Sequence, residues 1–214
     1  MKFAEGHASV LKNHGIKKVS TMGASWAEDP NVYVLMITSP GGEKIYGGAR
    51  IHIFSDANPL PCQQTFRLHD DRTDEVFEEL SKHGVAEFCA LWTSVEIAGL
   101  GVSAKDLVKC GWSLCEKLKI HRMVALLSPV TRRWMKELGL DHFTELANNG
   151  EIPYPTDRFI ATLTLYKHPE SRQNLDDEFL STVEALEKNP QLKQEVVGAR
   201  GKVTIHFDIE INVD

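Results

Sequence analysis

The stretch of this sequence best suited to chemistry is VEIAGLGV, at residues 95–102. It follows an apolar run at 86–93 and precedes apolar residues at helical spacing from Ser103 onward. The start of a helix presents unpaired backbone N–H groups and a partial positive charge, and glycines let an anion approach them without a Cβ in the way. The stretch therefore indicates a pyrophosphate cradle, while a tight turn with no ligand would use the same residues.

Two common phosphate-binding patterns do not fit this stretch. A Walker loop requires Gly-Lys-Ser/Thr, which is absent. A Rossmann fingerprint requires GxGxxG, whereas residues 99–104 read GLGVSA. Ser103, with Asp106 three residues later, instead predicts a capped helix directly after the glycines.

The neighbouring elements predict a strand–loop–helix–strand unit over 86–128, with a right-handed crossover. Upstream, the patterns predict a helix at 3–13, a β-hairpin from 32–39 and 44–54, a proline-containing loop at 56–64 and a helix at 73–83. Downstream, they predict a helix at 130–138, a strand at 158–166, a helix at 175–189 and an alternating strand at 201–214.

The loop resembles the pyrophosphate loop of the GNAT superfamily of acyl-CoA-dependent N-acyltransferases, Gln/Arg-x-x-Gly-x-Gly/Ala, here read from Glu96 to Gly101. The preceding strand carries an early Glu, and a Ser-Pro turn and ELGL at 137–140 follow in the family's order. The resemblance covers about 30–166. It implies an α/β (α+β) fold with a mixed, mostly antiparallel central sheet flanked by helices. Residues 1–168 would form this domain, and 169–214 a helix-and-strand extension packed on it or on a partner subunit.

A narrower resemblance points to the autoinducer-synthase and N-acyl amino acid synthase branch. The matching pieces are ARIHIF at 49–54, Pro59-Leu60-Pro61, the helix near 74–83 and Ala86-Glu87. This branch implies longer acyl groups, often delivered by acyl carrier protein.

Glu87 is the residue that the resemblance implies as the catalytic base. An amine is protonated at neutral pH, so it must lose a proton, directly or through water, before it attacks a thioester. A free glutamate, with a pKa near about 4.3, is a poor base, and partial burial beside Phe88 and Leu91 is expected to raise that pKa. A structural acid that pairs with a neighbouring strand is the alternative.

The resemblance implies acyl-CoA as cosubstrate. The pantetheine arm would lie along the backbone of Leu91 and Trp92, although Trp92 also suits an ordinary core. Six residues would offer backbone N–H groups to the pyrophosphate: Ile97, Gly99, Leu100, Gly101, Val102 and Ser103. Ser128 stands where many family members carry Asn. Arg132 is the expected phosphate contact in the basic stretch 117–136, which suits the 3′-phosphate of CoA, an acidic carrier protein or a solvated helix end.

Two residues depart from the family's pattern. Met135 replaces the tyrosine that protonates the leaving thiolate, and methionine cannot donate a proton. The acid would then be Tyr154 or water, or none would be needed. Glu96 replaces Gln or Arg, and a carboxylate beside phosphates would repel them. We therefore expect the Glu96 side chain to point away from the ligand, toward a basic residue.

Composition narrows the class of protein. A net charge of −6 over 214 residues argues against nucleic-acid binding. No apolar leader or membrane-length apolar run is present, and the four cysteines form no CxxC pair, so we expect a cytoplasmic protein without a metal site. The expected function is transfer of an acyl group to a small amine or amino acid. A non-catalytic acyl-CoA-binding module is the alternative, and the tail strand suits a homodimer.

Overall fold

A seven-stranded mixed sheet forms the centre of the computed structural model, which describes residues 2–13 and 25–211. Its strand order is β1-β2-β3-β4-β7-β5, and β6 also pairs with β7. The bounds are β1 (Val32–Thr38), β2 (Ile45–Ile53), β3 (Val85–Thr93), β4 (Arg122–Leu127), β5 (Asp141–His142), β6 (Glu151–Pro153) and β7 (Ile160–Lys167).

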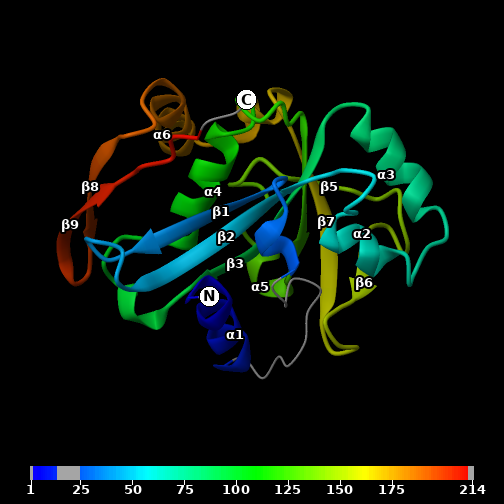
Figure 1. Ribbon diagram of the computed structural model, residues 1–214, viewed down its shortest axis with the longest axis horizontal. Coiled ribbons are helices and arrows are strands. Elements are labelled where there is room, and N and C mark those ends of the chain that lie inside the picture. The colour runs from blue at the N-terminus through cyan, green and yellow to red at the C-terminus, as the bar shows by residue number, and fades with distance from the viewer. Residues whose placement is uncertain (1, 14–24, 212–214) are drawn as a thin grey trace.

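Helices cover both faces of this sheet (Figure 1). The α-helices are α1 (Lys2–Asn13), α2 (Pro61–Phe66), α3 (Thr73–Ser81), α4 (Ala104–Ser113), α5 (Pro129–Arg132) and α6 (Asp177–Lys188). Three short 3-10 turns are η1 (Ser25–Glu28), η2 (Val95–Ile97) and η3 (Glu170–Asn174). Helix α4 packs on Phe88, whereas α1 packs on Trp92 and on Gly48 of β2. The sheet therefore has a core on each side.

Strands β3 and β4 form the parallel pair at the heart of the predicted strand–loop–helix–strand unit. They pair over only three positions, Val85–Arg122, Ala86–Met123 and Glu87–Val124. Beyond Glu87, β3 continues to Thr93 along β2, and no described residue of β4 accompanies it. The two strands therefore part at Glu87, which leaves one edge of β3 without a strand partner in the described structure.

Most of the predicted elements are confirmed, including the β1–β2 hairpin, helices α1, α3, α4 and α6, and strands β3, β4 and β7. The prediction of loop throughout 56–64 is wrong, because α2 begins at Pro61. Proline suits the first helical position, where no N–H partner is needed. The expected helix at 130–138 is also wrong in length, because α5 ends at Arg132 and only turns follow.

The tail forms a separate two-stranded sheet from β8 (Lys193–Gly198) and β9 (Gly201–His206). The long strand predicted at 201–214 thus ends at His206 within the described residues, and positions 212–214 lie outside them. The patterns did not predict β8. Figure 1 shows the hairpin standing at one side of the molecule, beside the ends of β1 and β2.

Helix α6 joins the tail to the main core. Phe179, Val183 and Leu186 of α6 are buried in the same cluster as Trp112 of α4. Burial of such side chains contributes about 1.5–3 kcal/mol each, so α6 is a substantial part of the core. No helix in the described ranges is long and apolar enough to cross a membrane.

Candidate active site

Glu87 lies where β3 and β4 part, and its side chain is buried, with 2% of the residue exposed. The Cys62 backbone N–H donates a 2.7 Å hydrogen bond to its Oε2. Burial raises the pKa of the Glu87 carboxyl to about 7, so the expected direction of the shift is confirmed. The expected surroundings are wrong for both named neighbours, since Leu91 packs against the same core cluster as Phe88. Phe88 points to the α4 face, because successive side chains of a strand alternate.

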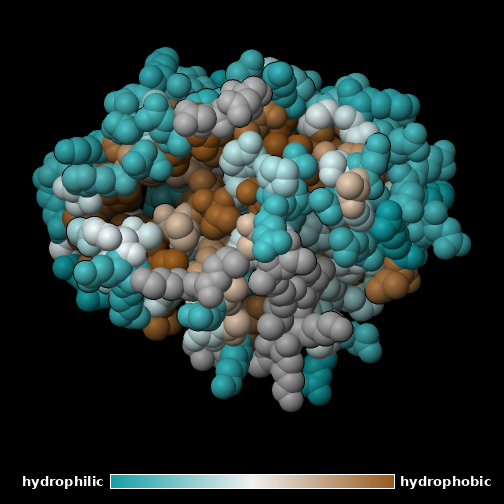
Figure 2. All heavy atoms as spheres, in the orientation of Figure 1, coloured by the Kyte–Doolittle hydropathy of each residue, from teal (hydrophilic) through white to brown (hydrophobic). Residues whose placement is uncertain are grey.

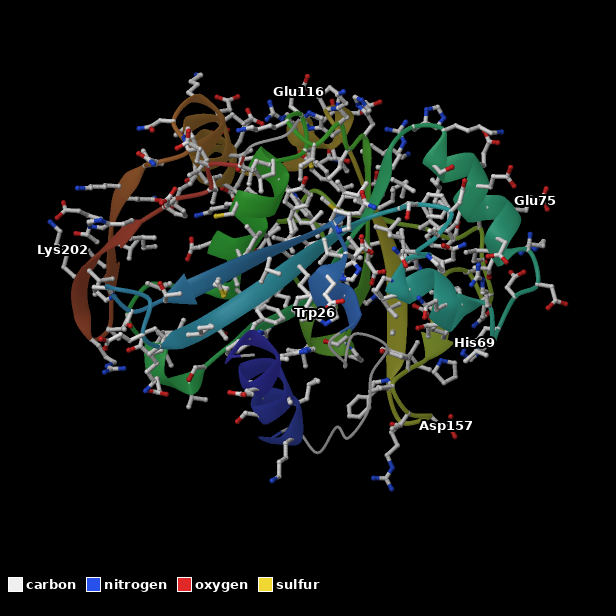
Figure 3. All side chains as sticks on the ribbon, viewed as in Figure 1. Trp26, His69, Glu75, Glu116, Asp157 and Lys202 are labelled. Carbon is white, nitrogen blue, oxygen red and sulfur yellow. The ribbon has the colours of Figure 1, made fainter. Side chains whose placement is uncertain are left out.

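Arg50 is a second buried charge on the face of the sheet that carries Glu87. It pairs in register with Cys89, next to the His52–Glu87 pair, and is 1% exposed. Its guanidinium carbon lies 4.2 Å from the centre of the Trp26 ring, a cation–π contact that helps to hold a buried cation. Figure 3 shows Trp26 over the middle of the sheet. Sequence reasoning missed Arg50, although a lone arginine in an apolar strand was a visible signal.

Two histidines border this polar group. Burial, together with the charge of Arg50, lowers the pKa of His7 and of His52 to about 4. Both imidazoles are therefore neutral near pH 7. Burial also raises the thiol pKa values of Cys62 and Cys89 well above their usual range, so neither is a thiolate. Among these groups, Glu87 has the pKa best placed for proton exchange at neutral pH.

Leu91 and Trp92 lie on the part of β3 that follows the separation from β4. The Trp92 side chain is 5% exposed and packs against α1, with its ring 6.1 Å from that of Phe3. A Cβ on Gly6 would lie 2.3 Å from the indole, which shows how closely the helix approaches. The side chain is thus a core residue, packed away from solvent.

The predicted cradle occupies the turn between η2 and α4. Gly99 and Gly101 have φ values of +78° and +84°, a left-handed conformation that favours glycine. Ser103 and Asp106 form the predicted capping box, in which the Ser103 N–H donates to Asp106 at 2.8 Å. The N–H groups of Ile97 and Leu100 donate to carbonyls within the same turn. Three of the six predicted phosphate donors therefore already have partners in the chain.

The turn of the β8–β9 hairpin, residues 198–201, lies directly on this glycine turn; we call it the hairpin tip. A Cβ on Gly198 would lie 2.2 Å from the Gly99 carbonyl oxygen and 2.4 Å from the Gly101 nitrogen. The Arg200 N–H donates to the Gly99 carbonyl at 2.8 Å, and Arg200 Nη1 donates to the Glu96 carbonyl at 2.8 Å. Sequence reasoning gave no sign of this contact between segments 100 residues apart.

The Glu96 carboxylate points to Lys44, whose Nζ lies 2.5 Å from Oε2. The expectation that a basic residue pairs with Glu96 is therefore confirmed. Both side chains are about half exposed, at 53% for Lys44 and 50% for Glu96, so water screens the pair. The ion pair neutralises the charge that would otherwise face the cradle.

The remaining predicted positions lie around α5. Ser128 caps this short helix by accepting a hydrogen bond from the Thr131 N–H at 3.3 Å. The Arg132 guanidinium forms an ion pair with Glu151, 2.5 Å from Nη1 to Oε1. Met135 is partly buried against the main core. Arg132 therefore has a carboxylate partner within the chain.

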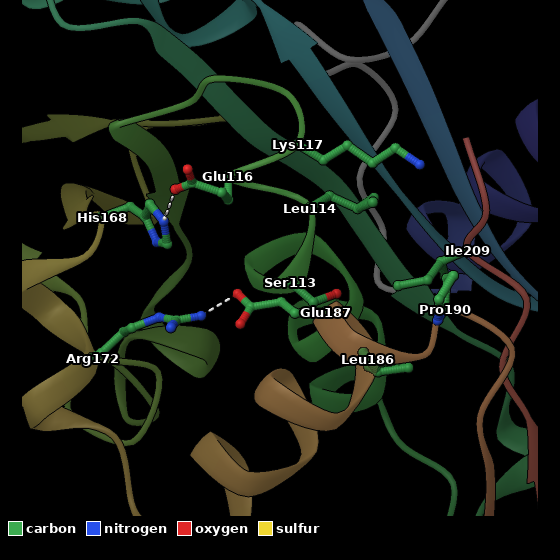
Figure 4. Close-up of a pocket in the computed structure, with 10 residues that line it drawn as sticks. All are labelled: Ser113, Leu114, Glu116, Lys117, His168, Arg172, Leu186, Glu187, Pro190 and Ile209. Carbon is green, nitrogen blue, oxygen red and sulfur yellow. Dashed lines mark hydrogen bonds and ion pairs between the residues drawn. The ribbon is translucent and has the colours of Figure 1, made fainter. Parts of the chain in front are cut away.

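A cavity of about 390 Å³ lies elsewhere, between the end of α4, η3 and α6 (Figure 4). An ion pair between Arg172 and Glu187 lines it, together with a 3.2 Å hydrogen bond between His168 Nε2 and Glu116 Oε2. In Figure 4, the two side chains of each pair point toward each other at the cavity wall. None of the predicted site residues lines this cavity.

Comparison with known proteins shows the fold. No protein-family model and no curated protein matches the chain. Among solved structures, FeeM, an N-acyl amino acid synthase from uncultured soil microbes, matches with a TM-score of 0.62 at 16% identity, over 82% of this chain and 94% of that one. A CoA-dependent acyl-homoserine lactone synthase, BjaI, with SAM and isopentyl-CoA, matches with a TM-score of 0.52 at 12% identity, over 88% and 81%. The chain therefore has the acyltransferase fold of these synthases, as the GNAT resemblance implied.

Proposed function

We propose that this protein is an N-acyltransferase that moves an acyl group from acyl-CoA, or from acyl carrier protein, to the amine of a small molecule or amino acid. The observation that carries the proposal is Glu87, a buried carboxyl with a pKa of about 7 where β3 and β4 part. The two synthases of the same fold, whose names describe acyl-transfer products, support this assignment.

The free edge of β3 is the proposed seat of the donor's pantetheine arm. Backbone groups of Leu91 and Trp92 on that edge would pair with the amides of the arm as a neighbouring strand does. Such binding directs the thioester along the gap between the strands toward Glu87. The Trp92 indole does not take part, since it is packed against α1.

Glu87 would remove the proton that the acceptor ammonium carries at neutral pH, directly or through water. The amine nitrogen then attacks the thioester carbonyl carbon, so that a C–N bond forms and the C–S bond breaks. The sulfur leaves as a thiolate, and the second proton that the nitrogen loses as the amide forms passes to this thiolate or to water. A thiol has a reference pKa near about 8.5, so departure without a general acid is feasible even though Met135 cannot supply a proton.

Arg50 would support this role by tuning the carboxyl. Burial alone raises the pKa of Glu87, while the nearby positive charge and the Cys62 hydrogen bonds act in the opposite direction. The balance leaves the carboxylate and the acid in comparable amounts near pH 7. A base in that state can both accept and release a proton during turnover.

The direct test is turnover with a panel of acyl-CoAs and small amines, read out as free thiol. We expect Glu87→Gln to lower kcat about 100-fold, which is typical for loss of a general base. Glu75→Gln is the matched control, because Glu75 is an exposed carboxylate that points outward from α3 (Figure 3). Turnover that survives Glu87→Gln would remove Glu87 from the role of base.

A non-catalytic acyl-CoA-binding module is the second candidate. Met135 favours this candidate, because methionine cannot act as the general acid. Helix α2 favours it as well, because the Cys62 N–H near the start of this helix covers the Glu87 carboxylate that an acceptor amine would have to reach. Calorimetric CoA binding without thiol release from any donor, across the amine panel, would support this reading over the enzyme.

A further inference from the structure

The hairpin tip fills the space that a bound diphosphate would need. A phosphate oxygen must come within about 2.9 Å of a backbone nitrogen to accept its hydrogen bond. Gly198 lies against the Gly101 nitrogen so closely that its own Cβ would be 2.4 Å away. The Gly99 carbonyl oxygen is likewise engaged, by the Arg200 N–H. The tip and a diphosphate therefore cannot both rest on this nitrogen.

The positive charge at the glycine turn is likewise held by protein groups. The Arg200 guanidinium donates to the carbonyl oxygens of Glu96 and Ala98, at 2.8 Å and 3.4 Å. In this position the guanidinium is engaged by backbone carbonyl oxygens of the turn. Lys44 is likewise paired with Glu96, so both of these cations are directed at oxygens of the chain.

Behind its tip, the β8–β9 hairpin makes few buried contacts with the rest of the molecule. None of the residues of β8 or β9 is buried. Figure 2 shows a hollow with hydrophobic side chains on its floor between the hairpin and β1. Firm contacts resume at the base, where the Phe207 N–H donates to Leu192 and the Phe207 ring is buried. Few buried contacts and exposed backbone bonds are the properties of a segment that opens at low free-energy cost.

We propose that the β8–β9 hairpin is a lid on the glycine turn, and that its tip competes with the diphosphate of CoA for the same place. The lid must lift about its base at Leu192 and Phe207 before the donor binds. This inference rests on the proposed function, since it takes the glycine turn as the diphosphate site of the donor. Apparent affinity for CoA is then reduced in proportion to the fraction of molecules with the lid open.

Two variants loosen the tip without touching Glu87. Gly198→Ala places a methyl group 2.2 Å from the Gly99 oxygen, while the φ of Gly198 lies outside the left-handed region. Arg200→Ala removes the side-chain hydrogen bonds to the turn. We expect each to tighten CoA binding at least about fivefold in calorimetry, through a larger open fraction. Lys202→Ala is the matched control, since Lys202 projects outward from the hairpin and pairs with Glu195 (Figure 3).

Hydrogen exchange of the unmodified protein gives an independent readout. Saturating CoA should speed exchange of the β8 and β9 amides, because the lid opens, and slow exchange at 99–104, because the diphosphate covers the turn. Slower exchange in both segments would overturn the lid and show a fixed wall that closes on the ligand. Unchanged or weaker CoA binding by Gly198→Ala and Arg200→Ala would overturn it as well.

A truncated donor separates failure of the lid from failure of the proposed function. An acyl-pantetheine carries the thioester but no diphosphate, so its turnover should be the same with and without Gly198→Ala. If acyl-pantetheine is turned over but no variant binds CoA, the lid inference fails and the acyltransferase stands. If CoA binding tightens as expected but no donor is turned over, the acyltransferase fails and the lid stands.

Discussion

The backbone N–H of Cys62 and the carboxylate of Glu87 are joined by a 2.7 Å hydrogen bond, across 25 residues of sequence. This bond ties the first turn of α2 to the point where β3 leaves β4. Its donor lowers the pKa of Glu87, whereas burial raises it more strongly. The same contact therefore both covers the proposed base and moderates its basicity.

Acyl transfer should depend on pH through Glu87. The carboxyl must be ionised to accept a proton, so we expect kcat/KM to fall about tenfold per pH unit below a pKa of about 7. The acceptor amine titrates too, so the profile should be measured with two acceptors of different amine pKa. If the fall in kcat/KM stays centred near pH 7 with both acceptors, the titrating group belongs to the enzyme. If it moves with the pKa of the acceptor amine, the titrating group is the acceptor. Glu87→Gln should not show the fall that belongs to the enzyme.

Stability should also depend on the ionisation of Glu87. Its pKa rises from an ordinary value of 4.5 to about 7 on folding, so the folded state binds the proton more tightly. The contribution of Glu87 to stability is therefore complete when the pH lies below the pKa of Glu87 in the unfolded chain. It is lost as the pH rises through the pKa of Glu87 in the folded protein, which lowers the free energy of unfolding by about 3 kcal/mol. Denaturant unfolding should show this decline in the native protein and a shallower one in Glu87→Gln. Equal slopes would contradict a strongly shifted carboxyl.

Glu96→Gln should tighten CoA binding about two- to threefold, because it removes a negative charge beside the diphosphate and releases Lys44. Stability should change by less than about 0.5 kcal/mol, since the ion pair is half exposed. Glu79→Gln, which breaks the exposed pair with Lys82, is the control. Looser CoA binding in Glu96→Gln would show that the carboxylate holds the turn in shape.

Arg132→Gln should weaken binding of CoA about threefold, through loss of one phosphate contact exposed to solvent. Binding of dephospho-CoA, which lacks the 3′-phosphate, should change little. Arg133→Gln is the control at the neighbouring exposed position. An equal loss of affinity for CoA and for dephospho-CoA would show that the ion pair with Glu151 maintains the local structure and that Arg132 does not bind the 3′-phosphate.

Phe179→Ala should destabilise the protein by about 3–5 kcal/mol, because the ring is buried between α6 and the core that contains α4. Glu178→Ala, one residue earlier on the exposed side of α6, should change stability little. Chemical unfolding gives both values. A small effect of Phe179→Ala would mean that the tail folds independently of the central sheet.

Local sequence patterns were sufficient to predict the strands and the helix around Glu87 and the glycine turn. Strand alternation, the Ser103–Asp106 capping box and the glycines before α4 act over a few residues, so they are legible without a structure. The α2 prediction failed because Pro61 suits both a loop and the first position of a helix. The contribution of Arg50 was missed because its environment comes from α1, η1 and β3 together.

By itself, the sequence determined most of the longer helices and strands, the position of Glu87 at the start of β3 and the glycine turn before a capped helix. Only the tertiary structure decided how deeply Glu87 is buried, which sets its pKa, and which residue neutralises Glu96. It also decided that the hairpin tip lies on Gly99 and Gly101. The physical reason is that burial, ion pairing and close packing depend on groups distant in sequence, whereas helix caps, turns and strand alternation depend on neighbours.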